Sequence, residues 1–181
     1  PTLGGPPTYV SLAARQLGLN VSVSSKDGKD FSREYISWLT ANNIDLSGLK
    51  IVKEASTTSF TLQYRNGKRK LRLRNQAPPI LLDDIHASLT SKTIHISPVA
   101  NEVPEEAVHR LRRLTNTLSF DPQGFVRKFS KEGNMHLRKW KGSGILEKID
   151  IYKSTSEEIK KMTGISDLRM SMKRIHDAGS K

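Results

Sequence analysis

Two short segments place charged or hydroxyl side chains where they could meet a ligand. In residues 121–127, Asp-Pro-Gln-Gly-Phe-Val-Arg, Asp121 follows a predicted buried strand, so its carboxylate and the Arg127 guanidinium could face a ligand together. The same spacing also allows a structural pairing of Asp121 with Arg127. In the second segment, Thr155 and Glu158 fit a capping box, in which a threonine caps a helix and a glutamate three residues later reaches back. A structural role explains this pair more simply than a ligand does.

A double glycine, Gly4-Gly5, precedes the first predicted helix. Without side chains, these glycines could let a ligand approach the backbone, where the free N–H groups and dipole of a helix start favour oxygen-rich or anionic groups. Glycine and proline before a helix are also common as simple turn residues. The pair alone does not decide between these alternatives.

Other kinds of chemistry lack the residues they need. The chain has no cysteine, which excludes disulfides, thiolate zinc sites and cysteine nucleophiles. Its histidines show neither an i,i+4 pair nor a carboxylate at metal-ligand spacing, so neither a metal cage nor a histidine-based triad is supported. They are His86, His95, His109, His136 and His176.

The net charge of +12 would attract phosphates on nucleotides, on sugars or on nucleic acid. Most basic residues are spread along the chain, which is typical of a solvated surface. The run Lys68-Arg69-Lys70, with Arg72 and Arg74, forms a basic ribbon that could contact nucleic acid. A non-catalytic, basic nucleic-acid- or nucleotide-binding module is therefore the alternative hypothesis, although nucleic acid is not the partner that we expect.

The first third of the chain reads as helix, strand, helix. Apolar residues recur at helical spacing from Val10 to Leu17, and Gly18 supplies a left-handed helix end. A strand over 20–24 and a second helix near 30–42 follow. Residues 57–75 then predict a hairpin around Asn66-Gly67, the dipeptide that a type I′ turn prefers. Its register would pair Leu62 with Leu71 on one apolar face, and Ala77-Pro78-Pro79 would end it.

From residue 93 onward, strands and helices alternate, which predicts a parallel sheet. The strands are expected at 93–97, 117–121 and 149–153, and the helices at 104–115, 156–163 and 167–178, with 122–148 irregular. Ligands of such sheets bind at the carboxyl ends of strands, here near Ser97, Asp121 and Thr155. The fold class is therefore α/β. No membrane span and no signal peptide are evident, and we expect a cytoplasmic protein.

Taken together, these segments resemble the ribokinase-like, phosphofructokinase-B family of carbohydrate kinases, in order and over nearly the whole chain. The stretch from Gly4 to Gly18 is similar to the family's early sugar-binding signature. Lys26–Phe31 resembles its Gly-x-Asp-x-Phe turn, Ser56–Phe60 its threonine-led strand, and Asp150–Glu158 its Asn-x-x-Glu element. Residues 121–127 are similar to a variant of some archaeal-type members.

The resemblance implies a Rossmann-like αβα sandwich with a small β-lid, to which the hairpin at 57–75 contributes, and one partial domain over 1–181. It also implies transfer of the ATP γ-phosphate to a sugar, polyol or nucleoside hydroxyl, with magnesium, and a homodimer formed through the lid. The residues it assigns to the substrate are Gly4, Gly5, Tyr9, Thr58 and Asp121. Those it assigns to the nucleotide are Arg127, Lys153, Thr155 and Glu158, with Glu158 near the metal through water.

The sequence departs from the family pattern in several places. Tyr9 stands where the family commonly has asparagine, and Thr155 replaces the asparagine of Asn-x-x-Glu. The Gly-Ala-Gly-Asp anion hole with the catalytic aspartate is absent, as are the strand before the double glycine and the strand expected after residue 181. We therefore predict that these residues alone form a substrate-side half without kinase activity, since phosphoryl transfer needs the base and the charge neutralisation.

Overall fold

The computed structural model describes residues 2–85, 90–140 and 144–180. Two compact units divide the chain. The first comprises Pro1–Thr61 and Leu73–Pro79, and the second comprises Leu62–Arg72 and Ile80–Lys181. In the described parts of the chain, no helix combines the length and the apolarity that a membrane crossing needs.

The first unit contains two helices and two parallel strands, which are α1 (Pro6–Gln16), β1 (Val21–Gly28), α2 (Arg33–Ala41) and β2 (Ile44–Val52). The predicted strand 20–24 was too short, and β2 was not predicted. Gly48 interrupts the apolar alternation of β2 because the two backbones approach closely there. A Cβ at Gly48 would lie 2.6 Å from the Ser24 hydroxyl oxygen.

The predicted hairpin is confirmed as β3 (Ser59–Arg65) and β4 (Lys68–Asn75). Asn66 and Gly67 both have positive φ angles, 51° and 70°, as a type I′ turn requires. The base of the hairpin belongs to the first unit and its tip, residues 62–72, to the second. Leu71 is half-buried while Leu62 is exposed, so the predicted apolar face is only partly covered.

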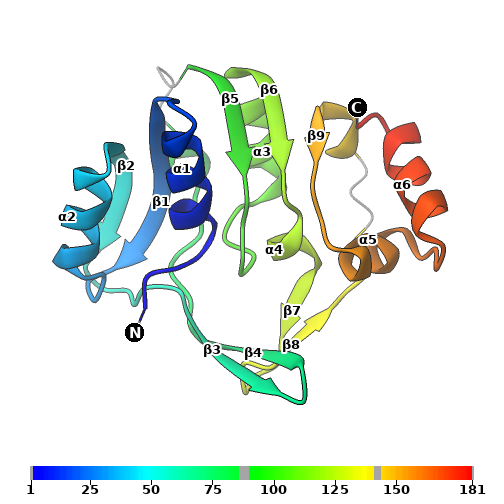
Figure 1. Cartoon of the computed structure of the whole chain (residues 1–181), viewed down its shortest axis with the longest axis horizontal. Coiled ribbons are helices and arrows are strands. Elements are labelled where there is room, and N and C mark those ends of the chain that lie inside the picture. The colour runs from blue at the N-terminus through cyan, green and yellow to red at the C-terminus, as the bar shows by residue number, and fades with distance from the viewer. Residues whose placement is uncertain (1, 86–89, 141–143, 181) are drawn as a thin grey trace. The chain divides into compact units, whose positions relative to one another are not determined.

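The second unit contains the predicted parallel sheet, with strand order β5 (Ser91–Ile96), β6 (Thr115–Phe120) and β9 (Ile151–Tyr152). Helix α3 (Glu105–Arg112) joins β5 to β6 and lies behind them in Figure 1. Helices α5 (Ser156–Thr163) and α6 (Leu168–Asp177) follow β9. The predicted bounds were close, except that β9 is shorter than 149–153.

The prediction of an irregular stretch over 122–148 was wrong in part. This stretch contains α4 (Gln123–Val126) and the antiparallel pair β7 (Arg127–Phe129) and β8 (Met135–Leu137). Single-turn 3-10 helices occur at Leu82–Asp84 and Leu146–Lys148. Elements of three or four residues carry too few side chains for a clear hydrophobic period, so the sequence pattern could not show them.

One face of the β5–β6–β9 sheet is apolar and the other is polar. Leu118 and Phe120 are fully buried on the first face, and the Phe120 ring packs 5.4 Å from the ring centroid of Phe125. Thr117 and Ser119 alternate with them and face the other way. The buried core therefore fixes the strands, and with them the polar residues at their carboxyl ends. The core comprises Ile96, Val108, Leu118, Phe120, Phe125, Val126, Trp140, Ile145, Leu146, Ile149, Ile159, Met162 and Ile175.

Candidate active site

Asp121 ends strand β6 and binds Lys153 rather than Arg127. Its carboxylate is buried, and Oδ2 accepts hydrogen bonds from the Lys153 Nζ at 2.6 Å and the Gln123 Nε2 at 3.0 Å. Oδ1 accepts from the Gln123 backbone N–H at 3.2 Å. The Lys153 side chain remains 63% exposed. The buried carboxylate thus fixes a lysine whose ammonium can still donate to a ligand.

Arg127, the first residue of β7, carries a charge that the protein only partly satisfies. Its side chain is 10% exposed, and its Nη2 lies 3.7 Å from Oε1 of Glu158, beyond hydrogen-bond distance. Its Nε is buried and has no hydrogen-bond partner. Burial lowers the pKa of Arg127, an effect that Glu158 opposes. A buried donor without a partner is unfavourable, so this guanidinium is suited to an anionic ligand.

The predicted capping box at the start of α5 is confirmed. Thr155 Oγ1 accepts from the Glu158 backbone N–H at 3.2 Å, and Glu158 Oε2 accepts from both the N–H and the hydroxyl of Thr155 at 2.9 Å. Glu158 is only 5% exposed. One carboxylate oxygen therefore caps the helix while the other faces Arg127, so the structural role and a site role belong to the same side chain.

His95 and Glu102 lie at the same end of the sheet and were missed by the sequence reasoning. His95 Nδ1 lies 2.9 Å from Ser119 Oγ across β5 and β6. Burial lowers the pKa of His95, and the negative charge of Asp121 opposes this. Glu102 accepts from the backbone N–H groups of Val99 at 2.7 Å and Ala100 at 2.6 Å. The alternation of β5, with His95 between two isoleucines, was a signal that could have placed the histidine on the polar face.

In the first unit, Gly4, Gly5 and Tyr9 lie together at the start of α1. Gly5 occupies the N-cap position with φ 84° and ψ 166°, and no side chain caps the helix. A Cβ at Gly4 would lie 3.4 Å from the Tyr9 hydroxyl oxygen. The first turn contains no acidic residue. Pro6 and Pro7 carry no N–H and those of Thr8 and Tyr9 donate to the Gly5 carbonyl oxygen at 3.2 Å, so what this helix start offers a ligand is the neutral backbone of the double glycine and the Tyr9 phenol.

Thr58 supports the base of the hairpin, because its Oγ1 accepts from the Ala77 backbone N–H at 2.9 Å. The neighbouring Thr57 closes the Gly-x-Asp turn. Its N–H donates to the Asp30 carboxylate at 2.7 Å, which lowers the pKa of Asp30, and its hydroxyl accepts from the Gly28 N–H at 3.1 Å. A Cβ at Gly28 would lie 2.3 Å from the Ser56 carbonyl carbon, so only glycine fits. The predicted substrate residues thus fall in both units, with Asp121 in the second.

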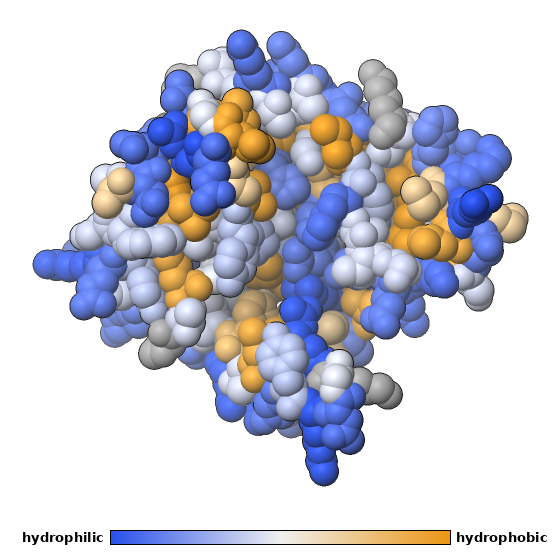
Figure 2. Space-filling view, viewed as in Figure 1, coloured by the Kyte–Doolittle hydropathy of each residue, from blue (hydrophilic) through white to orange (hydrophobic). Residues whose placement is uncertain are grey.

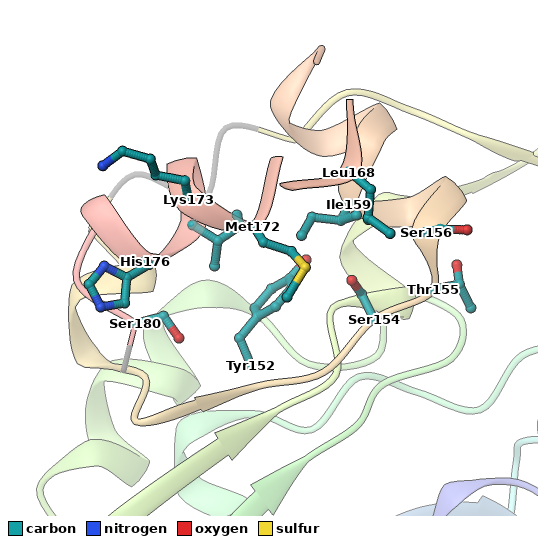
Figure 3. Close-up of a pocket in the computed structure, with 11 residues that line it drawn as sticks. Tyr152, Ser154, Thr155, Ser156, Ile159, Leu168, Met172, Lys173, His176 and Ser180 are labelled. Carbon is teal, nitrogen blue, oxygen red and sulfur yellow. The ribbon is translucent and has the colours of Figure 1, made fainter. Parts of the chain in front are cut away.

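A cavity of about 520 Å³ lies elsewhere in the second unit, between β9, α5 and α6 (Figure 3). Tyr152 lines it and donates its hydroxyl to the Met162 sulfur at 3.3 Å, and burial raises the pKa of Tyr152 to about 12. Of the predicted site residues, only Thr155 lines this cavity. Asp121, Arg127, Lys153 and Glu158 do not line it, so the cavity adjoins these charged residues only through Thr155.

Among residues 2–85, 90–140 and 144–180, no three histidine or carboxylate side chains gather closely enough to hold a metal ion. His86 lies outside the described residues. Glu158 fits magnesium only indirectly, because its Oε2 already accepts two hydrogen bonds and its Oε1 faces Arg127. Mg²⁺ usually keeps several of its waters, so contact through water suits this carboxylate.

Comparison with known proteins agrees with this geometry. The cytidine kinase of Thermococcus kodakarensis is 23% identical over 182 residues, which cover 98% of this chain and 62% of that protein. A pyrophosphate-dependent kinase of the ribokinase family, solved with a pyrophosphate analog and myo-inositol, is 30% identical with a TM-score of 0.84, over 99% of this chain and 63% of that one. Fructokinase from Vibrio cholerae O395 has a TM-score of 0.70 at 18% identity, over 97% of this chain and 59% of that one.

The chain thus spans about three fifths of the length of these relatives. The expected ribokinase-like α/β fold with parallel strands is confirmed by the solved structures. The model of the pfkB family of carbohydrate kinases matches residues 2–181. This chain belongs to the pfkB carbohydrate kinase family.

Proposed function

We propose that the protein transfers the γ-phosphoryl group of ATP to a hydroxyl group of a small polyol, sugar or nucleoside, with an inositol as the leading acceptor. The observation that carries this proposal is the buried Arg127 guanidinium with its unpartnered Nε, in the same unit as the exposed Lys153 that Asp121 fixes. Lys153 directly follows the parallel strand β9, and Arg127 begins β7 after the short helix α4 that follows β6, so both come after strands at whose carboxyl ends ligands of α/β sheets bind.

Phosphoryl transfer depends mainly on positioning the reactants and neutralising the charge of the phosphates. Arg127 can donate to a phosphate in a fixed geometry, and Lys153 can supply a second positive charge. The start of α5, at Thr155, adds the positive end of a helix dipole. Magnesium would be held near Glu158 through water and would supply further charge neutralisation. The catalytic base is predicted to lie outside residues 1–181.

The acceptor residues in this proposal are Gly4, Gly5, Tyr9 and Thr58 of the first unit and Asp121 of the second. Neutral backbone donors at the double glycine suit the hydroxyl groups of a polyol. Three hydrogen bonds already reach the Asp121 carboxylate, so its contribution would be mainly to orient Lys153. The inositol class is favoured because solved structures at 30% identity are kinases of myo-inositol.

Pyrophosphate is a second candidate donor. It is favoured by the same solved structures at 30% identity, which are described as pyrophosphate-dependent. Arg127 and Lys153 would contact phosphate oxygens alone, and both donors offer a diphosphate group. This cluster of charges therefore serves either donor.

We also propose that the hairpin at 57–75 acts as a lid that pairs two copies of the chain. The exposed fractions of Leu62 and Tyr64, 49% and 71%, support this proposal because exposed apolar side chains on a strand are suited to pairing. Sedimentation of the L62K variant would show a monomer if the pairing exists. An unchanged dimer would place the contact elsewhere.

The deciding experiment mixes the purified protein with ATP or pyrophosphate and with myo-inositol, cytidine or fructose, and measures phosphorylated product by mass spectrometry. We expect product with myo-inositol, and a loss of at least tenfold in the rate for R127Q, because a charge-assisted phosphate contact is removed. The proposal would be refuted if a preparation that exceeds 20.3 kDa in intact mass transferred no phosphoryl group from either donor to any of the acceptors. Turnover by a chain of 20.3 kDa would instead contradict the predicted inactivity of these residues alone.

A further inference from the structure

The tip of the basic hairpin lies beside the short antiparallel pair that begins with Arg127. Arg72 of β4 forms an isolated antiparallel bridge with Asn134, the residue before β8. Its Nε also donates to the Glu132 carbonyl oxygen at 2.6 Å. These residues all belong to the second unit. The β3–β4 and β7–β8 pairs are separate two-stranded sheets, and this single bridge brings the tip of the hairpin beside the β7–β8 pair, as can be followed in Figure 1.

The register of these contacts puts two arginines in one row. The bridge is isolated; if its antiparallel register were continued by three residues, Arg69 would lie opposite Leu137, which pairs directly with Arg127. Directly opposite residues of neighbouring strands project to the same face. Besides burial, the positive charge of Arg69 acts on Arg127 and lowers its pKa, which is consistent with the two guanidinium groups lying near each other. Both side chains are long enough to reach a common ligand between them.

The protein balances the charges in this row only in part, through Glu158 and the more distant Asp121 and Glu102. Arg127 is buried with its Nε unpartnered, and the charge of Arg69 adds to the lowering of its pKa. Arg69 is exposed, and in the parts of the chain that the structure describes it has no ion-pair partner. Glu158, at 3.7 Å from Arg127, is the carboxylate that faces the row, and it also caps α5. Two guanidinium groups on one face are therefore suited to an anion with several oxygens.

We propose that Arg69 and Arg127 together bind one phosphate or diphosphate group, with Arg69 contributed by the tip of the hairpin. The proposal rests on the proposed function, in which this group belongs to the phosphoryl donor or to the phosphorylated product. It gives part of the basic ribbon a specific role. Figure 2 shows hydrophilic side chains gathered over the hairpin, and only one row of these is assigned to the site.

The neighbouring row supplies a matched control. Lys70 follows Arg69 on the same strand, and the same register sets it opposite His136, which pairs with Lys128. Adjacent residues of a strand point to opposite faces, so Lys70 projects away from the row of Arg69 and Arg127. Lys70 and Arg69 are both exposed and carry the same charge. A general effect of net charge would therefore be equal for the two positions.

The experiment measures pyrophosphate binding by isothermal titration calorimetry for the wild type, R69Q, K70Q and R127Q, with urea unfolding to confirm that each variant folds. We expect R69Q to weaken pyrophosphate binding about tenfold, through loss of a charge-assisted contact, and K70Q by less than about twofold. R127Q should weaken binding at least as much as R69Q. R69Q is the deciding variant, because an exposed side chain can be replaced without disturbing the core. Equal effects of R69Q and K70Q would overturn the proposal.

Two further arms separate this proposal from the proposed function. Inositol 1-phosphate is titrated beside pyrophosphate: an R69Q effect confined to pyrophosphate assigns the row to the donor, and one confined to inositol 1-phosphate assigns it to the product. Kinase turnover with unchanged pyrophosphate affinity in R69Q would overturn the row and leave the function standing. Weaker binding in R69Q, together with no turnover in a wild-type preparation that exceeds 20.3 kDa in intact mass, would support the row and refute the function.

Discussion

The helix starts of α1 and α5 solve the same physical problem in opposite ways. A helix start has backbone N–H groups that need partners, and α1 reduces their number because Pro6 and Pro7 carry none. At α1, Gly5 holds the N-cap in a positive-φ conformation, no side chain caps the helix, and the first turn has no acidic residue. At α5, Thr155 and Glu158 cap each other, and Glu158 also faces the buried Arg127.

This difference suggests that the two helix starts suit different ligands. At α1, Pro6 and Pro7 carry no N–H and the N–H groups of Thr8 and Tyr9 donate to the Gly5 carbonyl oxygen, so this start offers only the neutral backbone of the double glycine, which suits the hydroxyl groups of an acceptor. The α5 start uses its donors internally and recruits charged side chains, which suits phosphates. Unit 1 also buries few large apolar side chains, among them Leu39 and Ile44, whereas a continuous core lies in unit 2. The charged site is thus built on the better-packed part of the chain.

The largest expected effect comes from breaking the α5 start with E158Q. The substitution removes the negative charge that faces Arg127 and leaves a buried guanidinium without a counter-ion. We expect the free energy of unfolding, measured in urea, to fall by about 3 kcal/mol, because removal of one partner of a buried ion pair is strongly destabilising. Glu157, exposed on the same turn, provides the control, since E157Q should stay within about 0.5 kcal/mol of the wild type. Equal stability of the two variants would show that Glu158 acts only through its neutral cap.

An intermediate effect is expected at the start of α1. Gly5 has φ 84° and ψ 166°, a region that only glycine occupies readily, although the space around it is open. G5A should therefore lower the free energy of unfolding by about 2 kcal/mol through backbone strain. G4A is the control, because its new methyl group would make only an ordinary contact with Tyr9, and we expect a change below about 1 kcal/mol. If the G5A protein were as stable as G4A, the backbone would relax at no cost, and the double glycine would be an ordinary turn before the helix.

The smallest expected effect concerns His95, whose pKa responds to the charges of both Asp121 and Lys153. Burial lowers the pKa of His95 from its ordinary value of 6.5, with Asp121 opposing and Lys153 reinforcing the shift. The unfolded chain then binds a proton that the folded chain excludes, so stability falls as the pH decreases below 6.5 towards the folded pKa. In H95Q, the unfolding free energy measured between pH 7 and pH 5 should fall less steeply than in the wild type. H136Q, at an exposed histidine of β8, should follow the wild-type profile, and a matching profile for H95Q would refute the assignment.

Features with a local cause could be predicted from the sequence. Asn66-Gly67 specifies its turn because both residues tolerate positive φ. Thr155 and Glu158 specify a cap because Glu158 stands three positions after Thr155 in the chain. The parallel order of β5, β6 and β9 followed from strands that alternate with helices. Strand β2 and the pair β7–β8 were missed, since close backbone approach at Gly48 and pairing of three-residue strands depend on neighbours distant in sequence.

The sequence by itself determined the residue types of the site, the cap at α5, the turn of the hairpin and the positive charge. Only the tertiary structure decided their partners. Asp121 and Arg127 could equally have paired by spacing, but β9 brings Lys153 to Asp121 and α5 brings Glu158 towards Arg127. In the same way, the bridge between Arg72 and Asn134 brings the tip of the hairpin to the β7–β8 pair. Such pairings are set by sheet register and packing, in which residues far apart in the chain share one face, and spacing along the chain cannot encode that alone.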